Sequence, residues 1–172
     1  MESNIDPIDN SIHLTHDKWN MYYHLPHDND WSISGYKLIM SNINNIEDVN
    51  LLTKNINENI IKNCMLFVMR HNIEPLWEHE ENRNGGCFSY KILNKYVHNV
   101  WNDLFKLLCG ESLVDSDISK HINGITISPK KNFCIIKIWL NNLDYQDPSI
   151  INNIENLTLQ GCIFKKHKPE DD

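Results

Sequence analysis

Trp77 and Glu78 are adjacent in the sequence, and their chemistry suits a nucleic-acid base. An indole presents a flat π-face on which a base can stack. A carboxylate presents two acceptor oxygens, which match the two adjacent donors on the Watson–Crick edge of guanine in a bidentate contact. Pro75 stiffens the approach because it fixes its own φ and favours an extended Glu74. The pair therefore predicts a place that could hold guanine.

The other tryptophans decide how much weight this pair carries. The chain has five tryptophans, and a tryptophan is most often a core residue. Trp101 lies on the apolar stripe of a predicted helix and Trp19 lies in a predicted strand, so both are predicted to be core. Trp31 lies in a polar loop with no amphipathic pattern to bury it, and Trp77 lies in a loop rich in acids. Two loop tryptophans and one acid could sandwich a base and read its edge.

Other chemical motifs in the chain are incomplete. His79 begins a stretch similar to a zincin motif, which lacks its second histidine. Two histidine pairs have metal-ligand spacing, but no cysteine or carboxylate set completes either site; they are His13 with His16, and His24 with His27. We see no nucleophile paired with a base. We therefore expect no catalytic residue, no metal site and no cofactor.

Composition limits the class of protein. The 172 residues suit one domain, and 41% hydrophobic with 23% charged residues is ordinary for a globular chain. A net charge of −7 argues against gripping long nucleic acid by its backbone, but not against a pocket for one nucleotide. The five cysteines are widely spaced and form no Cys-x-x-Cys motif. No apolar run approaches the roughly 20 residues that span a bilayer. The N-terminus lacks the features of a signal peptide. A cytoplasmic protein, possible also in the nucleus, is expected.

Both helices and strands are predicted around the candidate binding residues. Acidic tails are expected at residues 1–11 and 169–172, flanking one domain at 12–168. Helices are predicted at residues 45–54, 93–108 and 147–157 from cap residues and helical apolar spacing. Strands are predicted near residues 13–23, 34–43, 64–71, 87–92, 123–128, 133–139 and 161–167. Because strands and helices do not alternate, the expected fold is α+β, with helices on one face of an antiparallel sheet.

The strand predicted at residues 133–139 has two different faces. Alternate residues of a strand point to opposite sides of the sheet. One side carries Cys134 with isoleucines and would pack on helices, whereas the other carries Lys137 and Trp139. The second side is therefore predicted to be a working surface.

These residues, in this order, resemble the translation initiation factor 4E family, which binds the cap of messenger RNA. The resemblance runs from about His13 to His167. It implies a curved antiparallel sheet of about seven to eight strands, with three helices on the convex face and the cap pocket on the concave face. It rests on an ordered set of anchors: His13-Leu14, Trp19, Trp31, Ile73-Glu74-Pro75-Leu76-Trp77-Glu78, Asn82, Gly85-Gly86, Trp101, Gly110-Glu111-Ser112, Gly124, Ile138-Trp139 and His167.

The resemblance assigns a role to each base-binding position. Trp31 and Trp77 are implied to stack on the two faces of 7-methylguanine, and Glu78 to accept from its N1 and N2 donors. Trp139 is implied to lie against the N7-methyl group. Methylation makes the base cationic, and a desolvated cation between π-faces gains roughly 2 kcal/mol.

The phosphate positions depart from the family pattern. Lys130 stands where the family has an arginine, Ile135 where it has a lysine, and Cys87 where it has a basic residue. Lys131 and Lys137 are the expected substitutes. Since a lysine lacks the fork of an arginine, we expect weaker and more salt-sensitive phosphate binding than is typical.

The surface that receives a scaffold protein in this family also departs. His13 and Ile46 keep the family character. The remaining positions are polar or altered; they are Asn50, Asn102, Lys106 and Cys109. Loss of an anchor tryptophan at Asn50 removes a contact worth about 2 kcal/mol or more. We therefore expect weak or altered binding to a scaffold like initiation factor 4G.

Three functions remain open from the sequence. The first is a non-enzymatic monomer that binds capped messenger RNA in translation initiation, with no membrane association. The second is a competitor or repressor that holds caps without recruiting the scaffold. The third is an enzyme acting on caps or guanine nucleotides, which is disfavoured because no nucleophile, metal set or further base accompanies Glu78.

Overall fold

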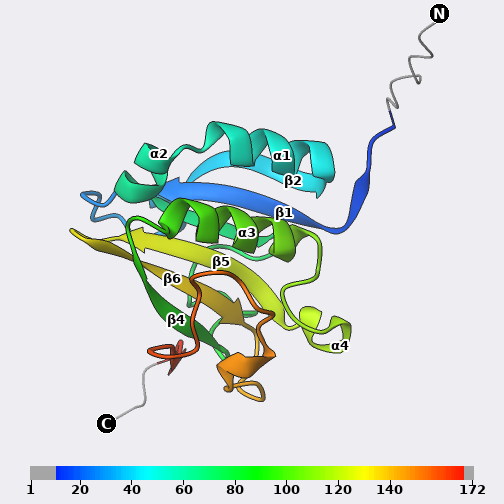
Figure 1. The fold of residues 1–172 in the computed structure, drawn as a ribbon, viewed down its shortest axis with the longest axis vertical. Coiled ribbons are helices and arrows are strands. Elements are labelled where there is room, and N and C mark those ends of the chain that lie inside the picture. The colour runs from blue at the N-terminus through cyan, green and yellow to red at the C-terminus, as the bar shows by residue number, and fades with distance from the viewer. Residues whose placement is uncertain (1–10, 169–172) are drawn as a thin grey trace, which may run out of the picture.

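Seven strands form one antiparallel sheet in the computed structural model, which describes residues 11–168 (Figure 1). The strand order is β2-β1-β3-β5-β6-β4-β7, and every predicted strand is present. The predicted tails lie outside the described residues, apart from Ser11. The strands are β1 Leu14–His24, β2 Lys37–Asn45, β3 Met65–Arg70, β4 Gly86–Leu93, β5 Ile122–Pro129, β6 Phe133–Leu140 and β7 Ile163–Lys166.

Three helices cover one face of this sheet, as the resemblance implied: α1 (Ile46–Asn55), α2 (Glu58–Asn63) and α3 (Val97–Cys109) (Figure 1). A short α4 (Ser116–Ser119) lies at one end. The predicted cap of α1 is confirmed, because the Asn45 side chain accepts a hydrogen bond from the backbone N–H of α1 at 2.8 Å. Two predicted helices are thus confirmed, although the second begins later than expected because residue 93 still pairs within the sheet.

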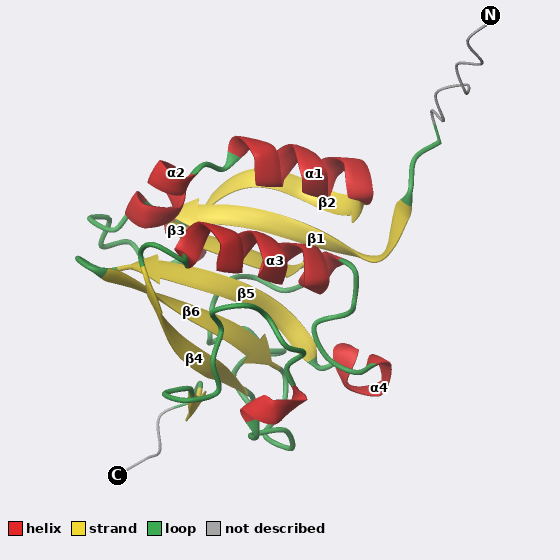
Figure 2. Cartoon of the chain, viewed as in Figure 1, coloured by secondary structure: helices red, strands yellow, loops and turns green. Residues whose placement is uncertain are grey.

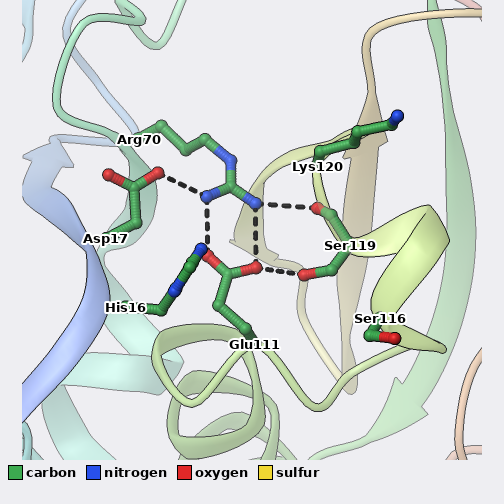
Figure 3. Close-up of a pocket in the computed structure, with 7 residues that line it drawn as sticks. All are labelled: His16, Asp17, Arg70, Glu111, Ser116, Ser119 and Lys120. Carbon is green, nitrogen blue, oxygen red and sulfur yellow. Dashed lines mark hydrogen bonds and ion pairs between the residues drawn. The ribbon is translucent and has the colours of Figure 1, made fainter.

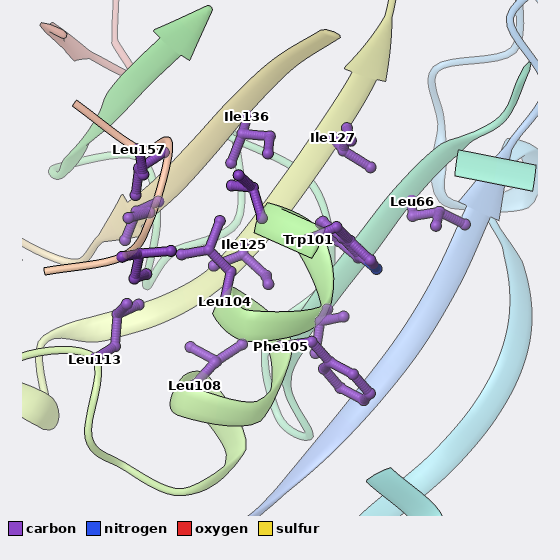
Figure 4. Close-up of a cluster of buried hydrophobic side chains, with 14 of the residues drawn as sticks. Leu66, Trp101, Leu104, Phe105, Leu108, Leu113, Ile125, Ile127, Ile136 and Leu157 are labelled. Carbon is purple, nitrogen blue, oxygen red and sulfur yellow. The ribbon is translucent and has the colours of Figure 1, made fainter. Parts of the chain in front are cut away.

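The main core lies between α3 and the sheet (Figure 4). The apolar stripe of α3 packs on β1 and β5, as the helical spacing predicted that it would face the core. Trp101 on α3 is 1% exposed and Trp19 on β1 is fully buried, which confirms both as core residues. Burying one large apolar side chain contributes roughly 1.5–3 kcal/mol, so this face supplies much of the stability.

The prediction of a third helix at residues 147–157 is wrong. Only a 3-10 turn, η2 (Pro148–Ile150), forms there, and Figure 2 shows the rest as loop. The backbone N–H of Asn152 donates instead to Leu113 O at 2.9 Å, and Asn156 has a φ of 66°. Ile151, Ile154 and Leu157 are nevertheless buried in the main core. The spacing of these apolar residues thus reflects their burial in the main core without a helix, in a segment whose asparagines favour helices weakly.

The opposite face of the sheet holds a second, smaller cluster. Met69, Ile73, Cys87 and Trp139 pack together there, apart from the main core. Side chains alternate along each strand, so these residues face away from the helices. Within the described residues, no helix is long and apolar enough to cross a membrane.

Candidate functional site

A cavity of about 380 Å³ opens on the sheet face that carries this second cluster. Strands β3, β4, β5, β6 and β7 contribute its floor and walls, and two loops contribute its rim. Five residues predicted for the site come together here; they are Trp31, Trp77, Glu78, Lys137 and Trp139. The structure thus brings the predicted aromatic residues, the acid and one predicted cation into one pocket.

Trp31 stands at one rim of the cavity, in the loop between β1 and β2. Its side chain is 52% exposed, which is unusual for an indole because of the apolar area left in water. One face of the indole stacks on the His24 ring, with centroids 4.2 Å apart and planes inclined by 5°. The indole is therefore supported from one side only.

Trp77 and Glu78 stand at the rim in the loop between β3 and β4. Trp77 is 40% exposed, and Glu78 is also exposed. The buried side chain of Asn82 organises this loop, because its Nδ2 donates to Leu76 O at 2.8 Å and its Oδ1 accepts from Asn123 Nδ2 at 2.8 Å. This explains the place of Asn82 among the sequence anchors: it holds the loop in the shape that presents the pair.

Trp139 forms part of the floor and is only 7% exposed. Its Nε1 donates to Thr126 Oγ1 at 3.3 Å, and its ring lies 4.6 Å from that of His167. Burial lowers the pKa of His167, opposed by its hydrogen bond to Asn82 O and assisted by the charge of Lys137. The His167 side chain is therefore neutral where it lines the cavity beside Trp139.

Glu78 also acts on a half-buried tyrosine that lines the same cavity. Burial, together with the negative charge of Glu78, raises the pKa of Tyr36 to about 12. Tyr36 packs edge-on against Phe67 of β3, with ring centroids 5.0 Å apart. The phenol stays protonated, so Glu78 is the acceptor available at this rim.

The cations of the cavity come from β6 and β7. Lys137 lines it as predicted, but Lys165 and Lys166 line it as well, and sequence reasoning missed both. Burial raises the pKa of the Cys87 thiol, while the charges of Lys137 and Lys165 oppose that shift. Cys87 thus lies between two lysines as a neutral part of the wall. The Lys-Lys pair just before the His167 anchor was the signal available in the sequence.

Gly86 allows β7 to reach the cavity. Gly86 pairs with Lys166 across the two strands, and a Cβ atom at Gly86 would lie 2.6 Å from Lys165 O and 2.6 Å from the Phe164 ring. A side chain there would push β7 away from β4. The glycine is required by close approach of the strands.

Lys130 and Lys131 lie outside this cavity. Both are exposed in the turn between β5 and β6, where the backbone N–H of Lys130 donates to Phe133 O at 2.8 Å. The structure therefore separates the three lysines predicted for phosphate, placing only Lys137 among the tryptophans.

The residues predicted for a partner lie on the helical side. The backbone N–H of Ile46 donates to His13 O at 2.9 Å, so these two residues are held together, and His13 Nδ1 lies 2.7 Å from Glu47 Oε1. Asn50 on α1 and Lys106 on α3 are exposed, and Asn102 on α3 is half-buried, with its Nδ2 3.3 Å from His98 Nε2. Cys109 is buried in the core, so it presents no surface to a partner.

A larger cavity, about 620 Å³, lies elsewhere and has a different character (Figure 3). Arg70 uses all its N–H groups there. Nε donates to Ile122 O at 2.8 Å, and Nη1 to Asp17 and Glu111, each at 2.6 Å. Nη2 donates to Glu111 at 3.1 Å and to Ser119 O at 2.7 Å. This cluster is a closed structural network, and we do not regard it as the binding site.

The described residues contain no group of three His, Cys, Asp or Glu side chains placed to hold a metal ion. The five cysteines are free thiols. The tryptophan cavity offers indole faces for stacking, a carboxylate that accepts hydrogen bonds, and lysines that attract anions.

Comparison with known proteins identifies the family. The family model for eukaryotic initiation factor 4E matches residues 14–169. A mimivirus homologue of eukaryotic translation initiation factor 4E is 44% identical over 64 residues, covering 36% of this chain and 23% of its own length. The wheat initiation factor NCBP is 29% identical over 109 residues, covering 62% of this chain and 46% of its own length. The chain thus matches less than half the length of these relatives.

Solved structures share the fold. A schistosome eIF4E complexed with m7GpppA and 4E-BP has a TM-score of 0.69 at 22% identity, covering 77% of this chain and 74% of its own. An Ascaris suum eIF4E-3 with m7G cap has a TM-score of 0.70 at 17% identity, covering 80% and 78%. With the family model spanning nearly all the described residues, the conclusion is direct: this chain belongs to the eukaryotic initiation factor 4E family.

Proposed function

We propose that this protein binds the 7-methylguanosine cap of messenger RNA and acts in translation initiation. The observation that carries the proposal is the pair of half-exposed loop tryptophans, Trp31 and Trp77, at the rim of one cavity with Glu78. Exposed indoles leave stacking surface unused, and a flat cationic base would use it. The schistosome and Ascaris relatives, which are solved with cap ligands, support the same ligand.

Each group has a distinct task in this proposal. Trp31 and Trp77 stack on the two faces of the base, and Glu78 accepts from N1 and N2 of guanine. Trp139, held by Thr126 in the floor, lies against the N7-methyl group. Ordinary base stacking contributes roughly 1–3 kcal/mol per base, and the positive charge of the methylated base adds to it. The methylated base is therefore preferred to plain guanine.

The triphosphate is assigned to lysines. Lys137, Lys165 and Lys166 line the cavity, and the charges of the first two act on the same thiol. Lys130 and Lys131, exposed at the next turn, would meet the outer phosphates or the following nucleotide. Because lysines act as point charges, this binding should be more salt-sensitive than binding by an arginine fork.

Retention on a 7-methylguanosine resin tests the proposal. The protein should be retained and then eluted by 7-methylguanosine triphosphate, but not by guanosine triphosphate. Trp31→Ala should pass through the column, whereas Lys120→Ala, exposed at the other cavity, should behave as wild type. A wild-type protein that passes through the column refutes the proposal.

A second function is favoured by the helical face. Asn50 and Lys106 present polar groups where the resemblance implies apolar contacts with a scaffold, and Cys109 is buried. A protein that holds caps but engages the scaffold weakly would repress translation. Addition to a cap-dependent translation extract distinguishes the two functions, because an initiation factor stimulates the extract and a repressor only inhibits it.

Enzymatic action on the cap is the least supported of the three. Members of this family bind caps and are not enzymes, and Glu78 is used here for recognition. Incubation with a cap-labelled RNA provides the test, because release of a labelled nucleotide would reveal turnover.

A further inference from the structure

The indole of Trp31 owes its orientation to very few contacts. It belongs to a loop without regular structure, and half of its surface is in water. The His24 ring lies parallel to it at 4.2 Å. One indole face is therefore occupied by this imidazole, and the other face is the one left for a base.

His24 also contacts the start and the middle of the loop that carries Trp31. It is the last residue of β1 and is completely buried. Its Nδ1 lies 2.9 Å from Leu25 O, and its Nε2 lies 2.8 Å from Asp30 O. A carbonyl oxygen only accepts, so a protonated ring nitrogen is the donor in such a contact, and the two ring nitrogens each face one carbonyl. No other aromatic side chain could stack on the indole and also present a ring nitrogen to each of these two carbonyls.

The surroundings keep this ring in place. Tyr36 packs edge-on against it, with centroids 5.0 Å apart. A Cβ atom on Gly35 would lie 1.8 Å from Asp30 O and 3.1 Å from His24 Nε2, so the backbone closes tightly around the imidazole. The Asp30 carboxylate is engaged with Ser32 and Ser34, whose hydrogen bonds lower its pKa to about 2. Asp30 is thus held through its carboxylate by Ser32 and Ser34 and through its carbonyl by His24.

We propose that His24 is a positioning residue for the base pocket, which sets the plane and place of Trp31 before any ligand arrives. Stacking fixes the tilt of the indole, and the contact with Asp30 O fixes the residue just before it. An ordered pocket loses less entropy on binding, so this support strengthens affinity without touching the ligand. The inference rests on the proposed cap binding and adds a residue that the sequence analysis considered only as half of a metal pair.

Two substitutions separate the two actions of the ring. His24→Phe keeps an aromatic ring under Trp31 but removes both hydrogen bonds, whereas His24→Gln keeps a donor for Asp30 O but loses the ring. Calorimetric titration with 7-methylguanosine triphosphate should show each variant about tenfold weaker than wild type. His27→Ala, an exposed change in the same loop, should bind as wild type. Ile154→Val, a buried change in the other core, should lower stability but not affinity.

A second readout reports on Trp31 without ligand. Its contribution to the emission spectrum is the difference between a protein and the same protein carrying Trp31→Phe. That difference spectrum should change in His24→Phe and stay unchanged in His27→Ala. The inference is overturned if His24→Phe binds 7-methylguanosine triphosphate within twofold of the wild-type affinity. If His24→Phe does not fold, the affinity of His24→Gln is judged by the same limit. If the wild-type protein binds no cap, the proposed function is refuted. In that case the positioning role is still tested, because an unchanged Trp31 difference spectrum in His24→Phe overturns it.

Discussion

The two cavities of this protein differ in what their polar and aromatic groups still offer. The Arg70 cavity is the larger, at about 620 Å³ against about 380 Å³, yet its guanidinium is fully bonded to protein acceptors. The tryptophan cavity leaves Trp31, Trp77 and Glu78 exposed at its rim. Volume therefore does not identify the ligand site; unused interaction capacity does.

The same difference separates folding from binding. Arg70 joins β1, β3, α4 and the end of α3, and it lies 4.5 Å from the ring of buried Trp19. Burial opposes its charge, but Glu111 and Asp17 outweigh burial and raise its pKa. The loop tryptophans, by contrast, leave a large part of their indoles in water. Substitutions at the first cavity should thus change stability, and substitutions at the second should change affinity.

Arg70→Met should have the largest effect. The substitution leaves the Glu111 carboxylate in a largely buried site without its cation. We expect it to lower the unfolding free energy by about 3 kcal/mol. This value is at the lower end of the usual range because the other carboxylate, Asp17, stays partly in solvent. Urea unfolding measures this loss. Lys120→Met, on the rim of the same cavity, should be nearly neutral, and cap affinity at 20 °C should not change in either variant that is folded.

Trp31→Ala should show the opposite pattern. Losing one face of the sandwich removes roughly 1–3 kcal/mol of binding, or about tenfold to a hundredfold in affinity. Its unfolding free energy should fall little, because the side chain is half in water. The matched control is Trp101→Ala, which should cost about 3–5 kcal/mol of stability. A stability loss in Trp31→Ala as large as that in Trp101→Ala would contradict the separation.

Substitutions in two pairs of lysines test which cations bind the phosphates at the second cavity. The double variant Lys165→Ala with Lys166→Ala should weaken binding of 7-methylguanosine triphosphate and lower the slope of log affinity against log salt by about 1. The matched double variant Lys130→Ala with Lys131→Ala should lower it less, because those residues lie outside the cavity. Titrations from low to high salt measure both slopes. An equal reduction by the two double variants would contradict the assignment.

The smallest effect is a pH dependence from His167. Its ordinary pKa is 6.5, and burial lowers that value in the folded protein. The unfolded chain therefore binds more protons between the lowered pKa and 6.5, so the stabilisation is complete above pH 6.5 and is lost as pH falls through that window. The loss should be smaller than the effects of the preceding substitutions. Urea unfolding at pH 7.5 and 5.5 should show a weaker pH dependence in His167→Gln than in wild type.

Much of the fold was predictable because local patterns agree with the tertiary structure. The alternation in β6 correctly separates the core face from the face of Lys137 and Trp139. The prediction at residues 147–157 failed because the apolar residues there are buried in the main core by a loop and not by a helix. Short α2 and α4 carry too few residues for a periodic pattern.

The sequence also predicted that Trp31, Trp77 and Glu78 lie together, whereas the neighbours that support Trp31 and most of the cations of the cavity were not predictable. Trp31, Trp77 and Glu78 are adjacent to polar loop signals in the chain. Lys165 enters the cavity only through the pairing of β7 with β4, and His24 meets Trp31 only through the closure of a loop. Such neighbours depend on strand register and chain reversal, which one sequence does not display.

The place of β7 gives the pocket a dynamic consequence. This strand has four residues and pairs on one side only, with β4, at the edge of the sheet. Edge segments of this kind open locally at a small fraction of the global unfolding free energy. Each opening would carry two lysines away from the cavity, so an anionic ligand that needs them must also hold the strand closed. Binding would thus appear as slower hydrogen exchange along β7, far more than along α3.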